Sequence, residues 1–212
     1  MKLRNLFTTV FFSISLALLS WSGVQAADQP YKLVEPAQPT QSGDKIEVLE
    51  IFWYGCPHCY AFEPFIENWL KNKPDDVAFR RVPGVLGRDW IAHARAFYTA
   101  EQLGILDQIH EPLFDAIHKE RRKIFSGEQL RDFFAEHGVD KDEFTRIYNS
   151  PEVTDKIKQA FIEAKNYKVT GVPTVIVNGK YLTSASMAGS YEKLVEIINQ
   201  LVEMERNAKA GK

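Results

Sequence analysis

The chain has 212 residues, of which 45% are hydrophobic and 25% are charged, and its formal net charge is −2. This is the composition of an ordinary globular protein. A slightly acidic chain without a basic run gives no reason to expect nucleic-acid binding.

The N-terminus has the pattern of a secretory signal peptide. Lys2 and Arg4 supply the positive start, an apolar run follows at residues 6–19, and residues 24–26 offer the small side chains that a signal peptidase reads. The run is shorter than the roughly 20 residues that span a bilayer, so we predict cleavage after Ala26 rather than a retained membrane anchor. The mature protein is therefore expected to be soluble and exported.

The next segments alternate between strand and helix patterns. After an extended arm at 28–43, we predict a buried strand at 45–53, a helix through 61–71 and a second strand at 76–82. From residue 89 the pattern becomes helical, with helices at 91–103, 106–119, 126–138, 140–149 and 152–167. Ser126 and Gln129 have the spacing of a capping box at the start of the third of these helices.

Strand signals return near the C-terminus. Residues 173–182 form two β-rich runs joined by Asn178-Gly179, which suits a tight type I′ hairpin, and an amphipathic helix follows at 191–204. This order predicts an α/β sheet interrupted by helices. We expect a discontinuous sheet domain at 27–88 and 166–212, with a helical insertion domain at 89–165.

Both cysteines of the chain lie in the segment FWYGCPHCYAF, at positions 56 and 59. A disulfide between them closes a very short loop, and because crosslink stabilisation grows with loop size, a structural role explains it poorly. Residues three apart share a helix face, so the pair can bond if a helix begins there. Pro57 favours the first helical position, which puts Cys56 exposed at the helix N-terminus and Cys59 one turn in.

A helix N-terminus favours an anion, so the pKa of Cys56 should be lowered. Each pKa unit favours the reduced form by about 1.4 kcal/mol and raises the potential by roughly 30 mV, which makes the disulfide a donor. His58 lies between the sulfurs and can donate hydrogen bonds to them. The alternative is an exposed loop histidine without a role.

Other uses of this cysteine spacing fit less well. A zinc site needs four ligands, and the remaining histidines are scattered at positions 93, 110, 118 and 137. A c-type haem site needs histidine after the second cysteine, where Tyr60 stands. We therefore expect no metal and no bound organic cofactor.

The segments EVLEIFWYGCPHCYAFEP and TGVPTVIVNGKY make the chain resemble the DsbA family of periplasmic thiol:disulfide oxidoreductases, within the thioredoxin superfamily. The resemblance implies a thioredoxin fold with an inserted all-helical domain. It implies that Cys56 is the nucleophile held in the mixed disulfide and that attack by Cys59 releases it. It also implies that Val172-Pro173 is a cis-proline loop facing the redox pair, whose Val172 backbone pairs with substrate. The alternative is a trans proline that starts a strand.

Glu50 is a further candidate, because it shares an inward strand face with Val48 and Phe52. Burial should raise its pKa, and it could then shuttle the proton of Cys59; the family likeness also places an acid here. The alternative is a structural partner for Arg80 or Arg81.

Five aromatic residues near the redox pair could form the core or line a peptide groove. We expect groove exposure only for Tyr54, and core positions for the others, which are Trp53, Phe62, Phe65 and Trp69.

The predicted function is that of a periplasmic dithiol oxidase, which donates the Cys56–Cys59 disulfide to reduced, newly exported proteins. The resemblance implies reoxidation by a quinone-linked membrane partner of the DsbB type, and we expect a monomer. One alternative is a reductase or isomerase on the same fold, although residues 27–44 are too short for the dimerisation domain that isomerases carry. The other is a secreted binding protein with an incidental disulfide.

Overall fold

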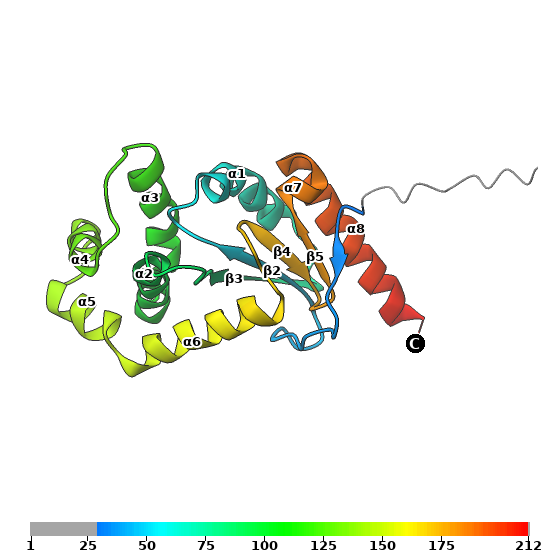
Figure 1. The fold of residues 1–212 in the computed structure, drawn as a ribbon, viewed down its shortest axis with the longest axis horizontal. Helices are drawn as coiled ribbons and strands as arrows, with labels where there is room; N and C mark the ends of the chain where they lie inside the picture. Colours follow the sequence, from blue (N-terminus) through cyan, green and yellow to red (C-terminus); the bar gives the residue numbers. More distant parts are fainter. Residues whose placement is uncertain (1–28, 212) are drawn as a thin grey trace, which may run out of the picture.

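A computed structural model describes residues 29–211, which form a five-stranded sheet flanked by helices (Figure 1). The predicted signal peptide and its cleavage site lie outside the described residues. Within the described part of the chain, no helix is both long enough and apolar enough to cross a membrane.

The sheet is mixed and has the strand order β1-β5-β4-β2-β3. Its central strand, β2 (Ile46–Phe52), pairs in parallel with β3 (Val77–Pro83) and antiparallel with β4 (Thr174–Val177). Strands β5 (Tyr181–Ser184) and β1 (Lys32–Leu33) extend the other side in antiparallel pairing. All seven residues of β2 are buried, and all but Glu47 and Glu50 are apolar, as expected for a strand covered on both faces.

Helices α1 (Pro57–Asn72) and α8 (Tyr191–Ala210) cover one face of the sheet, where Ile46 and Val48 pack against Phe62 and Ile198. The alternate side chains of β2, such as Leu49 and Ile51, belong to a second apolar cluster on the opposite face. This second cluster is shared with the helices that precede β4, so the sheet and those helices have a continuous core.

Those helices are α2 (Trp90–Leu103), α3 (Leu106–His118), α4 (Gly127–Glu136), α5 (Lys141–Tyr148) and α6 (Pro151–Asn166). Figure 1 shows α2 to α5 gathered beside the sheet, while α6 runs back beneath it. The predicted boundaries fall just before α2 and in the last turn of α6. The division into a sheet domain and a helical insertion domain remains our proposal.

Most predicted elements are confirmed with small shifts at their ends. The Ser126–Gln129 capping box is present, and positive φ angles of 50° at Asn178 and 67° at Gly179 build the predicted hairpin turn. Helix α8 is longer than predicted, because its polar last turns are anchored by Glu205 to Lys180 and by Arg206 to Asp76. The short elements β1 and α7 (Ala185–Ala188) were not predicted.

Candidate active site

The redox pair lies where the chain leaves β2 and enters α1. Cys56 is the N-cap residue of α1 and Pro57 occupies the first helical turn, as predicted. No disulfide joins Cys56 and Cys59, and both are described as thiols. The prediction of an exposed Cys56 is wrong: only 8% of this residue is exposed, because the loop that carries Val172 packs against its sulfur.

The backbone just before Cys56 passes close to the Trp53 side chain, and this packing depends on Gly55. A Cβ atom at this position would lie 2.4 Å from the indole ring of Trp53. That indole stacks on Trp90, with ring centroids 4.4 Å apart and an angle of 4° between the planes. Gly55 is therefore required for space, and the stacked rings join the redox loop to α2.

Cys56 has the properties of a stabilised thiolate. A hydrogen bond from the Cys59 thiol, aided by the backbone N–H groups of Cys59 and His58 and by the His58 charge, lowers the pKa of Cys56 to about 6 against the effect of burial. The Cys59 backbone nitrogen lies 3.4 Å from the Cys56 Sγ. The N-terminal amides of the helix thus hold the sulfur, as the sequence predicts.

Cys59 has the opposite character. Burial, followed by its hydrogen bond to Cys56, raises the pKa of the Cys59 thiol far above its ordinary value. Cys59 is fully buried. At neutral pH, Cys56 is therefore a good leaving group and Cys59 retains its proton.

The peptide bond between Val172 and Pro173 is cis, as the family resemblance implies. The Val172 carbonyl oxygen lies 3.5 Å from the Cys56 Sγ and accepts its hydrogen bond in the thiol form. Residues 116 positions apart in the sequence thus meet at the sulfur. The predicted contact of this loop with the redox pair is confirmed.

His58 is exposed, and its Nδ1 lies 3.3 Å from the Tyr191 hydroxyl of α8. Its effect on Cys56 comes through its backbone N–H and through its charge. The expected hydrogen bond from the His58 ring to a sulfur is not among the contacts of residues 29–211. The ring points instead toward the start of α8.

Glu50 lies in a buried ionic cluster beneath the helix. Its Oε2 lies 3.0 Å from Arg81 Nε, and the same guanidinium contacts Glu63 at 3.1 Å and Glu67 at 2.9 Å. Burial is the main cause that raises the pKa of Glu50 to about 7, with Arg81 opposing it and Glu63 adding to it. The raised pKa of Glu50 agrees with the predicted role as a proton shuttle for Cys59. The ion pair with Arg81 agrees with the alternative, a structural partner for an arginine of the next strand.

Glu63 was missed by the sequence analysis. Burial raises its pKa to about 7 as well, and one oxygen of Glu50 and one of Glu63 are buried without a hydrogen-bond partner in the described residues. Its position could have indicated burial near the redox pair. Glu63 stands four residues after Cys59, beside the apolar stripe that Phe62 and Ile66 form on α1.

The prediction that Tyr54 is exposed in a peptide groove is wrong, because Tyr54 is fully buried. Its hydroxyl pairs with His110 Nδ1 at 2.9 Å, and its backbone carbonyl oxygen lies 2.7 Å from His118 Nε2. Burial, with a smaller effect from Arg81, lowers the pKa of His110 to about 3, so the ring is neutral. The two histidines tie α3 to the redox loop.

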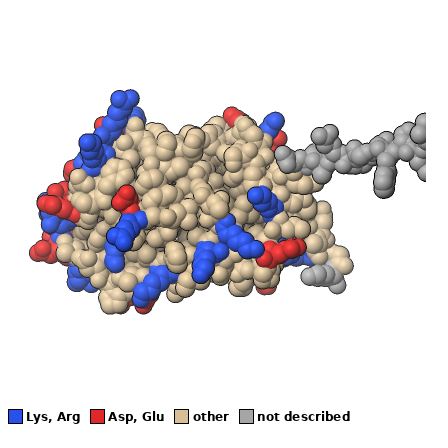
Figure 2. Space-filling view, viewed as in Figure 1, with Lys and Arg blue, Asp and Glu red and all other residues tan. Residues whose placement is uncertain are grey.

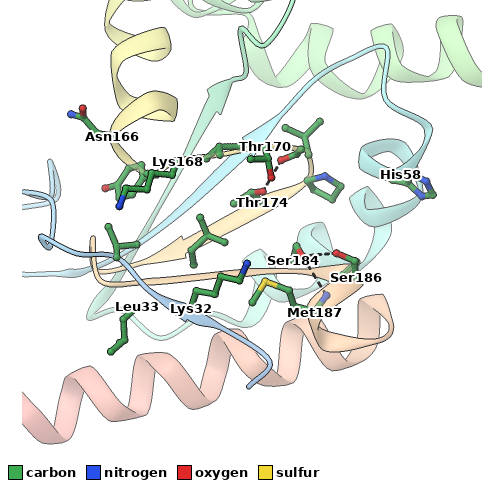
Figure 3. A pocket seen from close by; sticks show the side chains of 18 of the residues that line it. Lys32, Leu33, His58, Asn166, Lys168, Thr170, Thr174, Ser184, Ser186 and Met187 are labelled. Carbon is green, nitrogen blue, oxygen red and sulfur yellow. Dashed lines mark hydrogen bonds between the residues drawn. The ribbon is translucent and has the colours of Figure 1, made fainter. Parts of the chain in front are cut away.

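A pocket of about 650 Å³ opens beside the cis-proline loop and extends to β1 (Figure 3). Its lining includes His58 and Tyr191 at the redox end and Lys32 and Lys168 farther away. In the view of Figure 2, the surface over α1 carries few charged side chains, while cations and anions are interspersed over the lower part of the molecule. The pocket beside the cis-proline loop is lined by apolar side chains such as Val172 and Leu182 and by uncharged polar ones such as Thr170 and Ser186.

Comparison with known proteins extends these observations. Residues 76–199 match a family model described as the DSBA-like thioredoxin domain, which is the fold that the sequence predicts. The thiol:disulfide interchange protein DsbA of Pseudomonas aeruginosa is 42% identical over 213 residues, covering 97% of this chain and 99% of that protein. The protein of the same name from Azotobacter vinelandii is 44% identical over 170 residues, with 80% and 79% covered.

Solved structures show the same likeness. The crystal structure of Pseudomonas aeruginosa DsbA has a TM-score of 0.82 and 43% identity, covering 87% of this chain and 95% of that one. The oxidoreductase NmDsbA1 from Neisseria meningitidis has a TM-score of 0.75 at 27% identity, with coverage of 86% and 94%.

Proposed function

This chain belongs to the DSBA-like thioredoxin-domain family, and from that premise we propose that it donates a Cys56–Cys59 disulfide to reduced, newly exported proteins. It is a protein thiol:disulfide oxidoreductase, as its relatives named thiol:disulfide interchange protein are. The observation that carries the direction of the reaction is the opposite acidity of the two thiols.

In the first step, a substrate thiolate attacks the Cys56 sulfur of the disulfide. A substrate–Cys56 bond forms, the Cys56–Cys59 bond breaks, and Cys59 leaves with the electron pair. Because burial raises the pKa of Cys59 so strongly, this thiolate must take up a proton at once. Glu50, whose charge is one of the causes that raise the Cys59 pKa, is the group that we assign to supply it.

In the second step, another substrate thiolate attacks the substrate sulfur of the mixed disulfide. The substrate gains its disulfide, and Cys56 leaves as a thiolate. With the pKa of Cys56 lowered to about 6, this leaving group is stable at neutral pH. Two electrons have then passed from the substrate to the protein, which is left as the dithiol.

The Val172 and Pro173 segment supports substrate binding, because its carbonyl group already faces the attacked sulfur. An extended substrate chain can pair with this backbone edge in the manner of an added strand. Pro57 starts the helix whose amides hold the Cys56 sulfur. His58 contributes through its backbone N–H and its charge.

The reduced protein must be reoxidised before it can act again. We assign this step to a quinone-linked membrane protein of the DsbB type, which would take the two electrons and restore the Cys56–Cys59 bond. The location that we propose is the periplasm, after removal of residues 1–26. The relatives named above support the family, and the partner and the cleavage site are our extensions of it.

A trapping experiment tests the proposal. The Cys59→Ala variant is first loaded with glutathione on Cys56 by disulfide exchange with oxidised glutathione. A reduced exported protein should then displace the glutathione as a thiolate and accumulate as a mixed disulfide with Cys56, while the Cys56→Ala variant treated in the same way should form none. The unaltered oxidised protein should convert the substrate to its disulfide form and end as the dithiol. If the Cys56→Ala variant oxidises the substrate equally well, the assignment is wrong.

A further inference from the structure

The pocket beside the cis-proline loop extends well past the reacting sulfur. It begins at His58 and Val172 and reaches the edge strand β1 and the loop after α6 (Figure 3). Its volume of about 650 Å³ is far larger than a single cysteine side chain needs. A substrate segment bound at Cys56 therefore has room to continue along this pocket.

Much of the pocket wall away from the redox pair is apolar. Val34, Leu182 and Met187 line it, together with the partly buried Val172. Such a wall accepts an extended chain by burying its apolar side chains, and this contact alone gives little selectivity among substrates. Uncharged polar groups such as those of Thr170 and Ser186 also line the pocket, and its charged groups are the ones that can select substrates by their charge.

Two lysines supply positive charge in the part of the pocket away from His58 and the redox pair. Lys32 comes from β1 and Lys168 from the loop after α6, and Figure 3 shows them on opposite walls of the pocket. Both are exposed, and neither has an ion-pair partner within residues 29–211. Other lysines of the described chain, such as Lys180 and Lys141, do have carboxylate partners.

Glu35 is the single acidic residue of the pocket lining. It also has no ion pair within the described residues, so it reduces the positive charge of the pocket without neutralising either lysine by contact. The pocket as a whole therefore carries an excess of positive charge at neutral pH. The unpaired ammonium groups of Lys32 and Lys168 are complementary in charge to a substrate segment that carries a carboxylate.

We propose that this pocket selects substrates in which an aspartate or glutamate side chain lies near the reacting cysteine, with the carboxylate held by Lys32 and Lys168. The inference rests on the proposed function, since it concerns the substrates of the same redox site. The substrate class is an extended, largely apolar segment with one acidic residue at a set distance from its cysteine.

The size of the effect follows from the exposure of the lysines. Ion pairs at exposed sites are weak, so the two lysines together should change the reaction rate by about threefold to tenfold at low ionic strength. Salt should reduce this effect, because it screens exposed charges. Extended binding also predicts that acidic residues act at alternate positions, since successive side chains of a strand point to opposite faces.

The test uses short peptides with blocked ends and a single central cysteine, in which one position at a time carries aspartate or asparagine. The measured quantity is the second-order rate at which each peptide reduces the oxidised protein, read by trapping the protein thiols. Two peptides supply the electrons and leave as a peptide disulfide. Blocked ends remove the terminal carboxylate as a rival ligand.

The ratio of the aspartate rate to the asparagine rate is compared between the protein and a Lys32→Gln, Lys168→Asn double variant. Asparagine is chosen at residue 168 because Lys168 has a positive φ of 54°, which asparagine tolerates. Aspartate also changes the acidity of the peptide thiol. This change affects the rate ratio equally in the protein and in the double variant, because both react with the same peptides, so it cancels when the two ratios are compared.

A matched control removes one positive charge elsewhere. Lys45 is exposed, precedes β2 at the end of the strand away from Cys56, and is not part of the pocket, so Lys45→Gln should keep the ratio of the unaltered protein. Glu35→Gln should increase the ratio, because it removes the opposing charge.

We expect the ratio to fall by about threefold to tenfold in the double variant, at alternate peptide positions and at low salt only. An equal ratio in the protein and the double variant at every position would overturn the inference while leaving the proposed function intact. A protein that reacts with none of the peptides would instead contradict the proposed function.

Discussion

Glu50 and Arg81 face each other across the parallel pair of β2 and β3, and the Glu50 Oε2 lies 3.0 Å from the Arg81 Nε. The other Glu50 oxygen is buried without a hydrogen-bond partner in the described residues. The Arg81 guanidinium forms ion pairs with Glu50, Glu63 and Glu67. Burial disfavours the charged form of Glu50 more than Arg81 favours it, so this carboxyl group holds its proton up to about neutral pH, which suits it to exchange protons with Cys59.

Replacing Glu50 by Gln should slow the steps in which Cys59 gains or loses its proton. General acid–base groups contribute about a hundredfold or more to such steps, so we expect a loss of at least about tenfold near neutral pH. The measurement is the rate at which Cys59 releases a mixed disulfide at Cys56, followed across pH. Unchanged rates at every pH would leave Glu50 with only its structural pairing to Arg81.

Glu50 should also make stability depend on pH. Its pKa is raised from 4.5 to about 7 on folding, so the folded protein retains a proton that the unfolded chain releases. Stability from this group is therefore complete below pH 4.5 and declines as the pH rises to about 7, by on the order of 3 kcal/mol. Urea unfolding of the oxidised protein, in which Cys56 does not titrate, should show this decline. The Glu50→Gln variant should show a smaller decline, and an identical one would contradict the account.

The ultraviolet absorbance of the Cys56 thiolate should titrate with a midpoint of about 6 in the reduced protein. Its pKa is lowered on folding from 9.0, so thiolate stabilisation of the folded dithiol is complete above pH 9 and is lost as the pH falls through about 6. The Cys59 thiol is the largest cause and the His58 charge a smaller one. Cys59→Ala should therefore raise the midpoint more than His58→Ser does, and the reverse order would contradict the hydrogen-bond assignment.

Tyr54→Phe should destabilise the protein by about 1–3 kcal/mol, because it leaves the buried His110 Nδ1 without its partner. Tyr167 is a suitable control, since it is only 3% exposed and has no side-chain hydrogen bond within residues 29–211. Tyr167→Phe should change the free energy of unfolding by less. Equal effects of the two substitutions in urea unfolding would show that the Tyr54–His110 contact contributes nothing.

Gly55→Ala should destabilise the redox loop by about 1–3 kcal/mol, since the added methyl group would lie 2.4 Å from the Trp53 ring. Displacement of Trp53 should also disturb its stacking on Trp90 and change the tryptophan fluorescence. Gly171→Ala is the matched control, because no heavy atom lies within 4 Å of its added Cβ. A Gly55→Ala protein with unchanged fluorescence and stability would refute the packing argument.

Features set by neighbouring residues could be predicted from the sequence. Pro57 at the start of α1, the Ser126–Gln129 capping box and the Asn178-Gly179 turn all follow from local backbone preferences. The inward position of Glu50 follows from strand alternation. These features were enough to locate the thiolate at a helix end.

Features that depend on distant contacts could not be predicted in the same way. Tyr54 can be buried because its hydroxyl group forms a hydrogen bond with His110, which lies 56 residues away in the sequence. Cys56 is covered by the Val172 loop, which lies 116 residues away. β1 has only two residues, too few for an alternation pattern, and it exists because β5 pairs with it.

The redox equilibrium of the Cys56–Cys59 pair is the sharpest measurement of whether this protein donates disulfides. The purified protein is equilibrated across a series of reduced and oxidised glutathione, and its free thiols are then trapped and counted. Stabilisation of the Cys56 thiolate predicts that the pair is largely reduced in buffers where structural disulfides remain oxidised. A pair that stays oxidised under strongly reducing conditions would contradict the disulfide-donor account and favour a reductase on the same fold.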